Sequence, residues 1–511
     1  MMPKPGQILS WVLLLGVVGY SLFSSQIGFP AYRDQHLGTA LHMSTHGIDL
    51  ENALILGFNA NQKPTLQEIP LWQAGAAWML RLGDGWVGGA NLFSLACFLL
   101  GIWPIWQIAQ RLVGPQGAWW CLAAYLSQPV VFYYAGCAST DGLSLSAALW
   151  SYETVRRFSR QGGWGWGFLA LGWSVVAALM KAPFFMAAGI AVAAPLAWER
   201  VWFPGTWCRL VSVGIFSAAA FLAWTRYTDR WLEQAIWPLV DLRLGHNPEM
   251  VFWYFGDWAY RLDPMVWIKA AWRFGNSICG SFALGGVIVG GFCLKNNQEG
   301  RAWLLGATCT TLIFSHLVLH HSHYFLMFAP AAALALGGAI SWLDQYIVPK
   351  MKIPAALSHL AIAIILAASL IQGSVGREVV LQFDPFPKKA ARSLAEHTSP
   401  QDRLLIVGGG WGGNLLMLSQ RDGLSLWNTE LLESKGNLAK AVEFGFTKLV
   451  LIRESPLLVA LQKTNPGGAE YSAKPFSDYL TPVAERFPIL YQDEQLMIRQ
   501  ILQPYPSRER R

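Results

Sequence analysis

Long stretches without a charged side chain constrain this sequence more than any other feature. No Asp, Glu, Lys or Arg lies between Lys4 and Arg33, and similar runs recur as far as residue 373. A helix of about 20 apolar residues crosses the hydrocarbon core of a bilayer, whereas helices of water-soluble proteins carry a polar face. With 53% hydrophobic and 14% charged residues, the chain is predicted to be an α-helical polytopic membrane protein.

The uncharged runs predict about eleven transmembrane helices. The first covers residues 8–25 and lacks an A-x-A cleavage site, so we expect an uncleaved anchor rather than a signal peptide. The sequence HHSH at 320–323 marks a turn between two spans. The other spans are expected at residues 88–110, 117–138, 139–155, 164–181, 183–198, 208–226, 276–294, 302–319, 324–343 and 353–373.

Basic residues concentrate in every second loop of this map, on one side of the membrane. The positive-inside rule assigns short loops rich in Lys and Arg to the cytoplasm. The N-terminus is then cytoplasmic, and an odd number of spans leaves the C-terminal part extracytoplasmic. The bacterial inner membrane is the expected location, and the endoplasmic reticulum fits the topology equally well. The cytoplasmic loops are defined by Arg111, Arg156, Arg157, Arg160, Arg200, Arg209, Lys295, Arg301, Lys350 and Lys352.

The composition changes near residue 376. Residues 1–376 are predicted to form the membrane domain, with long outer loops at about 29–87 and 227–275. Beyond it, RLLIV, KLVLI and QLMIRQI are typical of strands, and NLAKAVEFGF and FSDYLTPVAERF of helices. Residues 377–511 should therefore form a small extracytoplasmic α/β domain. Its LLIVGGGWGGNLL fits a dinucleotide-binding fingerprint, but an extracytoplasmic location favours a tight strand–helix turn.

The first outer loop contains an amphipathic segment. Leu37, Ala40, Leu41 and Met43 fall on one helical face, and Gly47 is placed to end the helix. This pattern predicts a helix that lies in the membrane interface rather than crossing it.

Composition also limits the partners. The net charge of +7 comes without a basic block, so membrane lipids are expected partners and nucleic acid is not. No CxxC pair occurs, which argues against a zinc ribbon. The His-x-His of the HHSH turn could chelate zinc, but the spacing identifies no third ligand. A solvated turn or substrate hydrogen bonding is preferred, so no cofactor is predicted, and a divalent metal stays open.

Ionisable side chains at the outer ends of the predicted spans are the candidate site residues. They are Asp34, Glu68, Asp141, Lys181 and the HHSH histidines. A carboxylate can accept the proton of a hydroxyl, and a lysine can hold a phosphate. The set therefore suits transfer of a sugar from a lipid-borne phosphate. Structural roles stay open, namely helix capping for the three carboxylates and snorkelling for the lysine.

Five segments resemble, in the same order, the polytopic GT-C glycosyltransferases, which include protein O-mannosyltransferases and bacterial aminoarabinose transferases. The resemblance covers residues 8–373 and extends loosely into the C-terminal domain. The segments are YRDQHLGTALHMSTHGIDL, EIPLWQAGAAWMLRLGDGWVGGANLFSLACFLLGIWPIWQIAQRLVG, ASTDGLSLSAALW, ALMKAPFF and HHSHYFLMFAPAAALALG.

The resemblance implies inverting transfer of a sugar from a polyprenyl-phosphate carrier to an acceptor on the extracytoplasmic face. The acceptor, whether protein, lipid or polysaccharide, is not implied. Asp34 matches the acidic residue thought to act as base in that family, and Glu68 matches an acidic residue before a proline. Relatives often have lysine directly before that proline, where this chain has Ile69. The substrate-binding set is Glu68, Asp141, Lys181, Lys63, Arg243, Arg261, His321, His323 and Tyr324.

Two other functions use the same charges. A transporter or flippase of lipid-linked sugars would need charges near the midplane of the membrane and internal repeats. The charges here gather at one face instead, and no repeat is visible. A polymerase or ligase that uses pyrophosphate-linked donors on the same face is the third reading.

Overall fold

The computed structural model places the described residues in two compact units. One unit lies within residues 1–27, 87–227 and 247–379, and the other within 28–86, 228–246 and 380–511. The first outer loop, expected in the membrane domain, thus groups with the C-terminal part of the chain. The described residues are 5–27, 34–50, 57–58, 68–199, 203–234, 248–280, 282–294, 297–352, 354–372, 386–407, 414–426, 445–452, 487–493 and 496–501.

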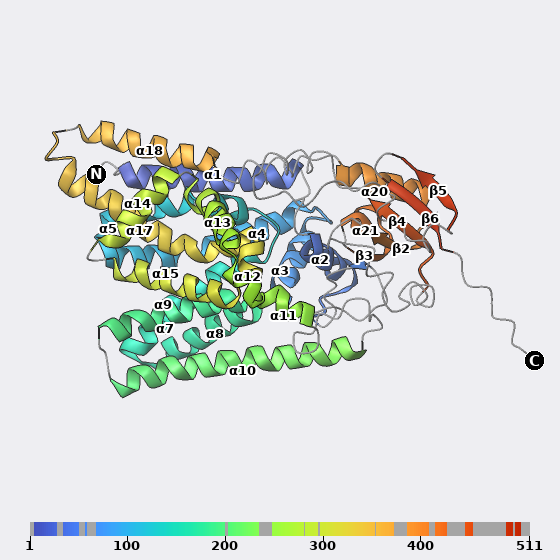
Figure 1. Ribbon diagram of the computed structural model, residues 1–511, viewed down its shortest axis with the longest axis horizontal. Coiled ribbons are helices and arrows are strands. Elements are labelled where there is room, and N and C mark those ends of the chain that lie inside the picture. The colour runs from blue at the N-terminus through green and yellow to red at the C-terminus, as the bar shows by residue number, and fades with distance from the viewer. Residues whose placement is uncertain are drawn as a thin grey trace, which may run out of the picture. The chain divides into compact units, whose positions relative to one another are not determined.

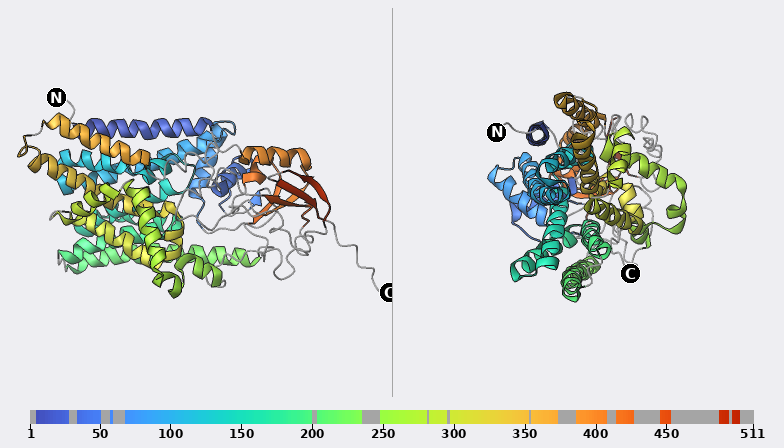
Figure 2. Two further views of the ribbon diagram at one scale, coloured as in Figure 1. Left: turned by 45° about the horizontal axis from the view of Figure 1, so that its top comes forward. Right: turned by 90° about the vertical axis from the view of Figure 1, so that its left-hand side faces the viewer.

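The first unit is a bundle of helices that run side by side (Figure 1), and Figure 2 also views them close to end-on. The long members are α1 (Pro5–Ile27), α4 (Gly88–Leu100), α5 (Ile102–Leu126), α7 (Asp141–Gln161), α8 (Trp164–Met180), α9 (Ala182–Trp198), α10 (Pro204–Gln234), α14 (Phe282–Cys293), α15 (Gln298–Ile313), α17 (Ala329–Trp342) and α18 (Ala355–Gln372). Between them lie α6 (Pro129–Ala135), α11 (Pro248–Phe255), α12 (Trp258–Leu262), α13 (Pro264–Phe274), η1 (Gly275–Cys279), α16 (Ser315–His320), η2 (Ser322–Phe328) and η3 (Leu343–Ile347).

Four helices of the described residues are long and apolar enough to cross a membrane: Pro5–Phe23, Gly88–Leu126, Pro204–Arg230 and Ser322–Ile347. Three shorter apolar helices are Trp164–Met180, Ala182–Trp198 and Ala355–Leu370. These helices confirm the predicted fold class of a polytopic α-helical membrane protein. The sequence-based number of spans is larger, because it also counts α7, α14 and α15 and divides 88–126 into two.

The predicted break between the spans 88–110 and 117–138 agrees with the geometry of α5. Gly114 has φ 73° and ψ 175°, which no helix tolerates, and Pro115 follows it. The rings of Trp106 and Trp119 lie 4.3 Å apart, whereas residues 13 positions apart in a straight helix are separated by about 20 Å. The chain therefore reverses at Gly114, inside the predicted turn between residues 110 and 117.

The predicted span at 276–294 is wrong in its first part. Residues 275–279 form the π-helix η1, which continues α13, and the axis then bends by 88° before α14. Gly280 makes this bend possible, since its φ is +67° and a Cβ there would overlap the main chain at Ser369. The uncharged run hides this bend because glycine is compatible with both a span and a turn.

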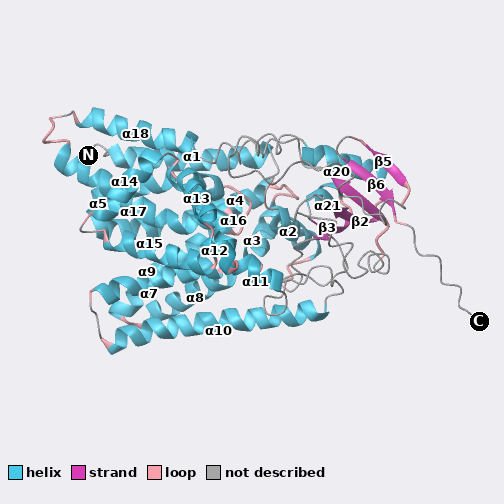
Figure 3. Cartoon of the chain, in the orientation of Figure 1, coloured by secondary structure: helices cyan, strands magenta, loops and turns pink. Residues whose placement is uncertain are grey.

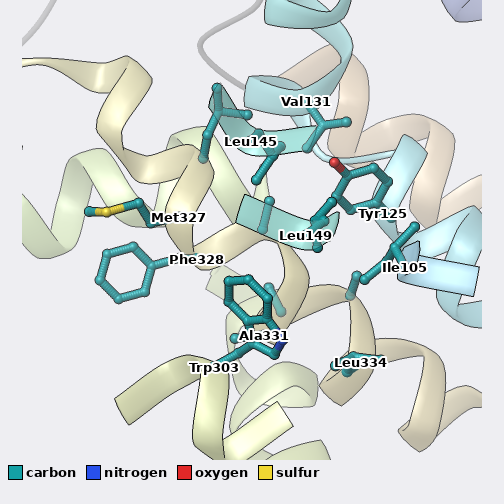
Figure 4. Packing of buried hydrophobic residues seen from close by; sticks show 14 of the residues in the cluster. Ile105, Tyr125, Val131, Leu145, Leu149, Trp303, Met327, Phe328, Ala331 and Leu334 are labelled. Carbon is teal, nitrogen blue, oxygen red and sulfur yellow. The ribbon is translucent and has the colours of Figure 1, made fainter. Parts of the chain in front are cut away.

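Close contacts between main chains hold the bundle together. Gly337 of α17 faces the backbone of Cys121 in α5, and Gly306 of α15 faces the carbonyl of Ala187 in α9. Small residues allow such approach in membrane helices, where dispersion rather than the hydrophobic effect drives packing. Larger side chains fill the spaces between, as Figure 4 shows for Tyr125, Leu149 and Trp303 among others.

The second unit contains a six-stranded sheet, the only magenta elements in Figure 3. Its order is β1-β3-β2-β4-β6-β5, with β2 parallel to β3 and β4 and the other pairs antiparallel. Helices α20 (Phe386–His397), α21 (Asn414–Ser419), α2 (Asp34–His46) and α3 (Leu71–Leu82) belong to the same unit. The strands are β1 (Gly57–Phe58), β2 (Arg403–Val407), β3 (Asp422–Leu426), β4 (Lys448–Ile452), β5 (Ile489–Gln492) and β6 (Leu496–Gln500).

Three strands, β2, β4 and β6, confirm the sequence-based strands, and the two-residue β1 comes from the first outer loop. Gly57 pairs with Leu424 and Phe58 with Gly423, so a segment of that loop extends the C-terminal sheet. The predicted helices at 437–446 and 476–487 lie almost wholly outside the described residues. The glycine-rich 408–413 lies outside them completely.

Helix α7 contains a buried carboxylate, that of Glu153, which is stabilised by two arginine side chains. The Glu153 carboxylate is 2% exposed and lies 2.7 Å from Arg111 Nη1 and 2.6 Å from Arg157 Nε. A carboxylate at such a site costs several kcal/mol unless it is paired, since water no longer solvates it. Two guanidinium groups provide that pairing here.

Replacing Glu153 should therefore destabilise the bundle. We expect Glu153→Gln to lower the free energy of unfolding by about 1–3 kcal/mol, because a neutral amide pairs weakly with two arginines. The matched control is Glu199→Gln, whose carboxylate pairs with Arg160 but is 35% exposed. That change should cost only about 0–1 kcal/mol. Thermal unfolding of the detergent-solubilised protein measures both, and equal losses would contradict the expectation.

Candidate functional site

A buried ion pair joins two of the sequence-predicted site residues. Asp141 is the first residue of α7, and Lys181 is the extended residue that separates α8 from α9, with φ −155° and ψ 99°. Lys181 Nζ donates a hydrogen bond of 2.7 Å to Asp141 Oδ1, and the two side chains are 2% and 0% exposed. Sequence separation is 40 residues, yet the α7–α8 hairpin brings both to one end of the bundle.

Aromatic and imidazole rings surround this pair on one side. Lys181 Nζ lies 5.0 Å from the centre of the Tyr324 ring, a cation–π distance. The rings of His323 and Tyr324 are 4.3 Å apart, and those of His321 and His323 are 5.2 Å apart. The structure thus brings together five of the candidate residues: Asp141, Lys181, His321, His323 and Tyr324.

The electrostatics of the pair decide what it can bind. Asp141 and Lys181 are neutral as a unit, and separating either ion from its partner costs several kcal/mol in a dry environment. A further anion near Lys181 is attracted by the ammonium and repelled by the carboxylate. A ligand with an anionic group beside hydroxyl groups fits this set, since hydroxyls can donate to Asp141 while the anion accepts from Lys181.

Sequence reasoning missed Tyr134 and Ser322. Tyr134 Oη lies 3.1 Å from Ser322 Oγ, and its ring meets the His323 ring edge-on at 6.2 Å. This contact ties α6 to the turn that carries the histidines. No local signal could reveal it, because 188 residues separate the two hydroxyl groups.

Arg261 has a different environment from the ion pair. Its guanidinium donates to the Phe255 carbonyl at 3.0 and 2.8 Å and to the Ile313 carbonyl at 3.0 Å. Arg273, which the sequence analysis did not select, donates to the Leu319 carbonyl at 2.7 Å. Both arginines fasten the segment α11–α13 to the chain around α16. The predicted contact of Arg261 with a phosphate stays a prediction.

The histidines form no metal centre with other residues of the described chain. Rings of His316, His320 and His321 gather around Trp253 at 5.1–5.3 Å. Within the described ranges, no three His, Cys, Asp or Glu side chains are arranged to hold a metal ion. The cluster is therefore an aromatic contact between α11 and the chain at α16.

The remaining candidates belong to the second unit or lie outside the described residues. Asp34 is the first residue of α2, and its side chain is not described. Glu68 is half-buried and comes three residues before α3. Lys63 and Arg243 lie outside the described residues.

A double-mutant cycle tests the buried pair. We expect Asp141→Leu and Lys181→Met each to lower the free energy of unfolding by about 3–5 kcal/mol, because each leaves one buried ion unpaired. The double variant should lose far less than the sum, since it removes both ions together. Unfolding midpoints in detergent provide the measurement. Additive losses would show that the two side chains do not interact.

Comparisons with known proteins identify similar structures but no related sequence. The chain matches no protein-family model and no curated protein sequence. It is similar to the crystal structure of ArnT from Cupriavidus metallidurans bound to undecaprenyl phosphate, with 13% identity and a TM-score of 0.64. That match covers 96% of this chain and 97% of ArnT. The apo form of the same protein gives 13% identity and a TM-score of 0.56 over the same shares.

The oligosaccharyltransferase of Archaeoglobus fulgidus in complex with Zn and sulfate is more distant. Its TM-score is 0.49 with 10% identity, covering 85% of this chain and 68% of that one. The ArnT match spans both chains almost from end to end, and it confirms the resemblance at the level of the fold. This chain has the fold of the polytopic GT-C glycosyltransferases.

Proposed function

We propose that this chain is an integral-membrane glycosyltransferase that moves a sugar from a polyprenyl-phosphate carrier to an acceptor. The observation that carries the proposal is the match, over 96% of this chain, to a protein solved with undecaprenyl phosphate. The buried pair of Asp141 and Lys181 supports it, because an ammonium group with nearby imidazole and phenol rings suits a sugar phosphate. Transfer takes place on the extracytoplasmic face, in a bacterial inner membrane with the N-terminus inside.

The reaction needs a base and a group that stabilises the leaving phosphate. Asp34 accepts the proton of the acceptor hydroxyl, whose oxygen attacks the anomeric carbon from the face opposite the phosphate. The bond between that carbon and the phosphate oxygen breaks, and polyprenyl phosphate leaves with the electron pair. The configuration at the anomeric carbon is thereby inverted.

Lys181 stabilises the charge that develops on the leaving phosphate. Its ammonium strengthens its interaction as the phosphodiester becomes a monoester with one more negative charge, which lowers the barrier. Glu68 and Asp141 orient substrate hydroxyl groups, and Lys63, Arg243 and Arg261 assist in holding the phosphate. His321, His323 and Tyr324 contact the sugar.

A transporter of lipid-linked sugars is the second candidate, on one specific observation. The segment α13–η1 meets α14 at 88° through Gly280, and discontinuous helices are common at transporter binding sites. Movement of a lipid-linked sugar across proteoliposomes without bond cleavage would support this candidate over transfer.

The first test is a transfer assay on the purified protein with a panel of polyprenyl-phosphate sugars. We expect wild type to consume one donor and release polyprenyl phosphate, and Asp34→Asn to lower the rate by about 10²–10⁴-fold. The matched control is Asp84→Asn, which removes the same charge from an exposed turn of the first outer loop. Asp84 has φ +51°, which asparagine also adopts readily, so that variant should keep full activity.

Intact donors in every reaction, even with host membranes added as a source of acceptor, would contradict the proposal. The transporter or a pyrophosphate-dependent enzyme would then be favoured. Equal losses in Asp34→Asn and Asp84→Asn would instead remove Asp34 from the base role and leave the transfer itself intact.

The phosphate role of Lys181 has a separate test. The Asp141→Leu/Lys181→Met double variant should fold, but its kcat/KM for the donor should fall by about 10²–10³-fold, because the ammonium is lost. Steady-state kinetics on the folded double variant measure this. Unchanged donor kinetics would show that another cation binds the phosphate.

A further inference from the structure

A buried polar pair joins helices α2 and α3 in the second unit. Gln73 Nε2 donates a hydrogen bond of 2.9 Å to His36 Nδ1. His36 is 6% exposed and Gln73 is 4% exposed, and the Trp72 ring meets the His36 ring edge-on at 6.3 Å. The pair therefore lies inside the interface between the two helices, away from water.

Hydrogen bonds at the other end of the helices fix their direction. Arg81 Nε donates to the Ser44 carbonyl at 2.7 Å, and Arg81 Nη2 donates to the Met43 carbonyl at 2.9 Å. The bonds His36–Gln73 and Ser44–Arg81 both join residues 37 positions apart. The helices are therefore parallel, and the same offset sets Asp34 level with Leu71, the first residue of α3.

This register brings two carboxylate positions to one end of the helix pair. Asp34 begins α2, and Glu68 comes three residues before Leu71. First turns of helices fray easily, because their N–H groups lack partners within the helix. An isolated helix of 13 residues is also marginal in water, so α2 depends on its packing. The polar pair lies one half-turn from Asp34, where it can prevent fraying.

Leu37, Ala40 and Met43 are fully buried, so apolar contacts already hold the middle of α2. The hydrogen bond between Gln73 and His36 fixes the register of the two helices and adds little buried apolar area. The second amide atom, Gln73 Oε1, is buried with no hydrogen-bond partner among the described residues. An unpaired buried carbonyl costs free energy, so an apolar side chain would suit stability better at this position.

We propose that His36 and Gln73 are positioning residues for Asp34. Their hydrogen bond locks the first turn of α2 against the first turn of α3 and thereby holds Asp34 beside Glu68. Neither side chain needs to touch the substrate. This inference rests on the proposed function, in which Asp34 is the base. Misplacing a catalytic group by about 1 Å can lower a rate about 10²-fold.

The test uses Gln73→Leu, His36→Leu and the double variant in the donor-transfer assay. Each single variant should lower kcat by about 10–100-fold and leave the donor KM within about twofold, because positioning acts on the reacting geometry. The double variant should be no slower than the slower single variant, since both break one interaction. His36→Asn should keep most of the wild-type rate. Its Oδ1, bonded to Cγ as Nδ1 of histidine is, can still accept the hydrogen bond from Gln73.

Arg81→Met is the matched control. It removes both hydrogen bonds to the opposite end of α2 and should keep kcat within about threefold of wild type. Amide hydrogen exchange provides a readout that does not depend on activity. It should rise at residues 38–40 in Gln73→Leu, because their N–H groups bond to carbonyls in the first turn of α2, and at residues 44–46 in Arg81→Met.

Wild-type kcat in Gln73→Leu and His36→Leu, with Asp34→Asn inactive, would overturn the positioning role and leave the proposed function standing. Equal kcat losses in Gln73→Leu and Arg81→Met would also overturn it, because the pair would then act only on general stability. If wild type transfers no sugar from any donor, the proposed function fails, and the positioning role fails with it.

Discussion

The lack of water in the hydrocarbon core determines where this chain can hold a charge. A lone ion there costs several kcal/mol, and pairing removes most of that cost. Helix α7 carries two buried ion pairs, with Asp141 bound to Lys181 at its first residue and Glu153 bound to Arg111 and Arg157 further along. At about 1.5 Å per residue, the two carboxylates are separated by about 18 Å. The first pair joins α7 to the residue between α8 and α9, and the second joins the middle of α7 to α5 through Arg111.

The two ion pairs differ in how far their positively charged partners are exposed to solvent. Glu153 has two arginines that are 26% and 27% exposed, so water and the membrane surface still solvate the positive charges. Lys181 and Asp141 are sealed from solvent, with rings of Tyr324 and His323 as the adjoining surface. A donor phosphate at Lys181, as proposed above, would compete with Asp141 for the ammonium group.

The membrane architecture could be predicted from the sequence because lipid imposes a simple rule on composition. Uncharged runs locate α1, α8, α9 and α10, and the charge at each end locates their turns. The bend at Gly280 could not be predicted, since glycine fits a span and a turn equally. Strands β2, β4 and β6 were visible as buried apolar runs. Strand β3, with Asp422, Gly423 and Ser425, was missed, because its neighbours rather than its own residues determine its pairing.

The candidate site was predictable only as a set of residue types at one side of the membrane. The predicted membrane map placed Asp141 and Lys181 on the same side of the membrane, but it could not reveal that each is the other's partner, because that depends on the α7–α8 hairpin. The pairing of His36 with Gln73 was equally hidden, since it depends on the parallel register of α2 and α3. The contacts in both places join residues 37 to 40 positions apart in the sequence. Helix packing, which the sequence encodes only indirectly, brings these residues together.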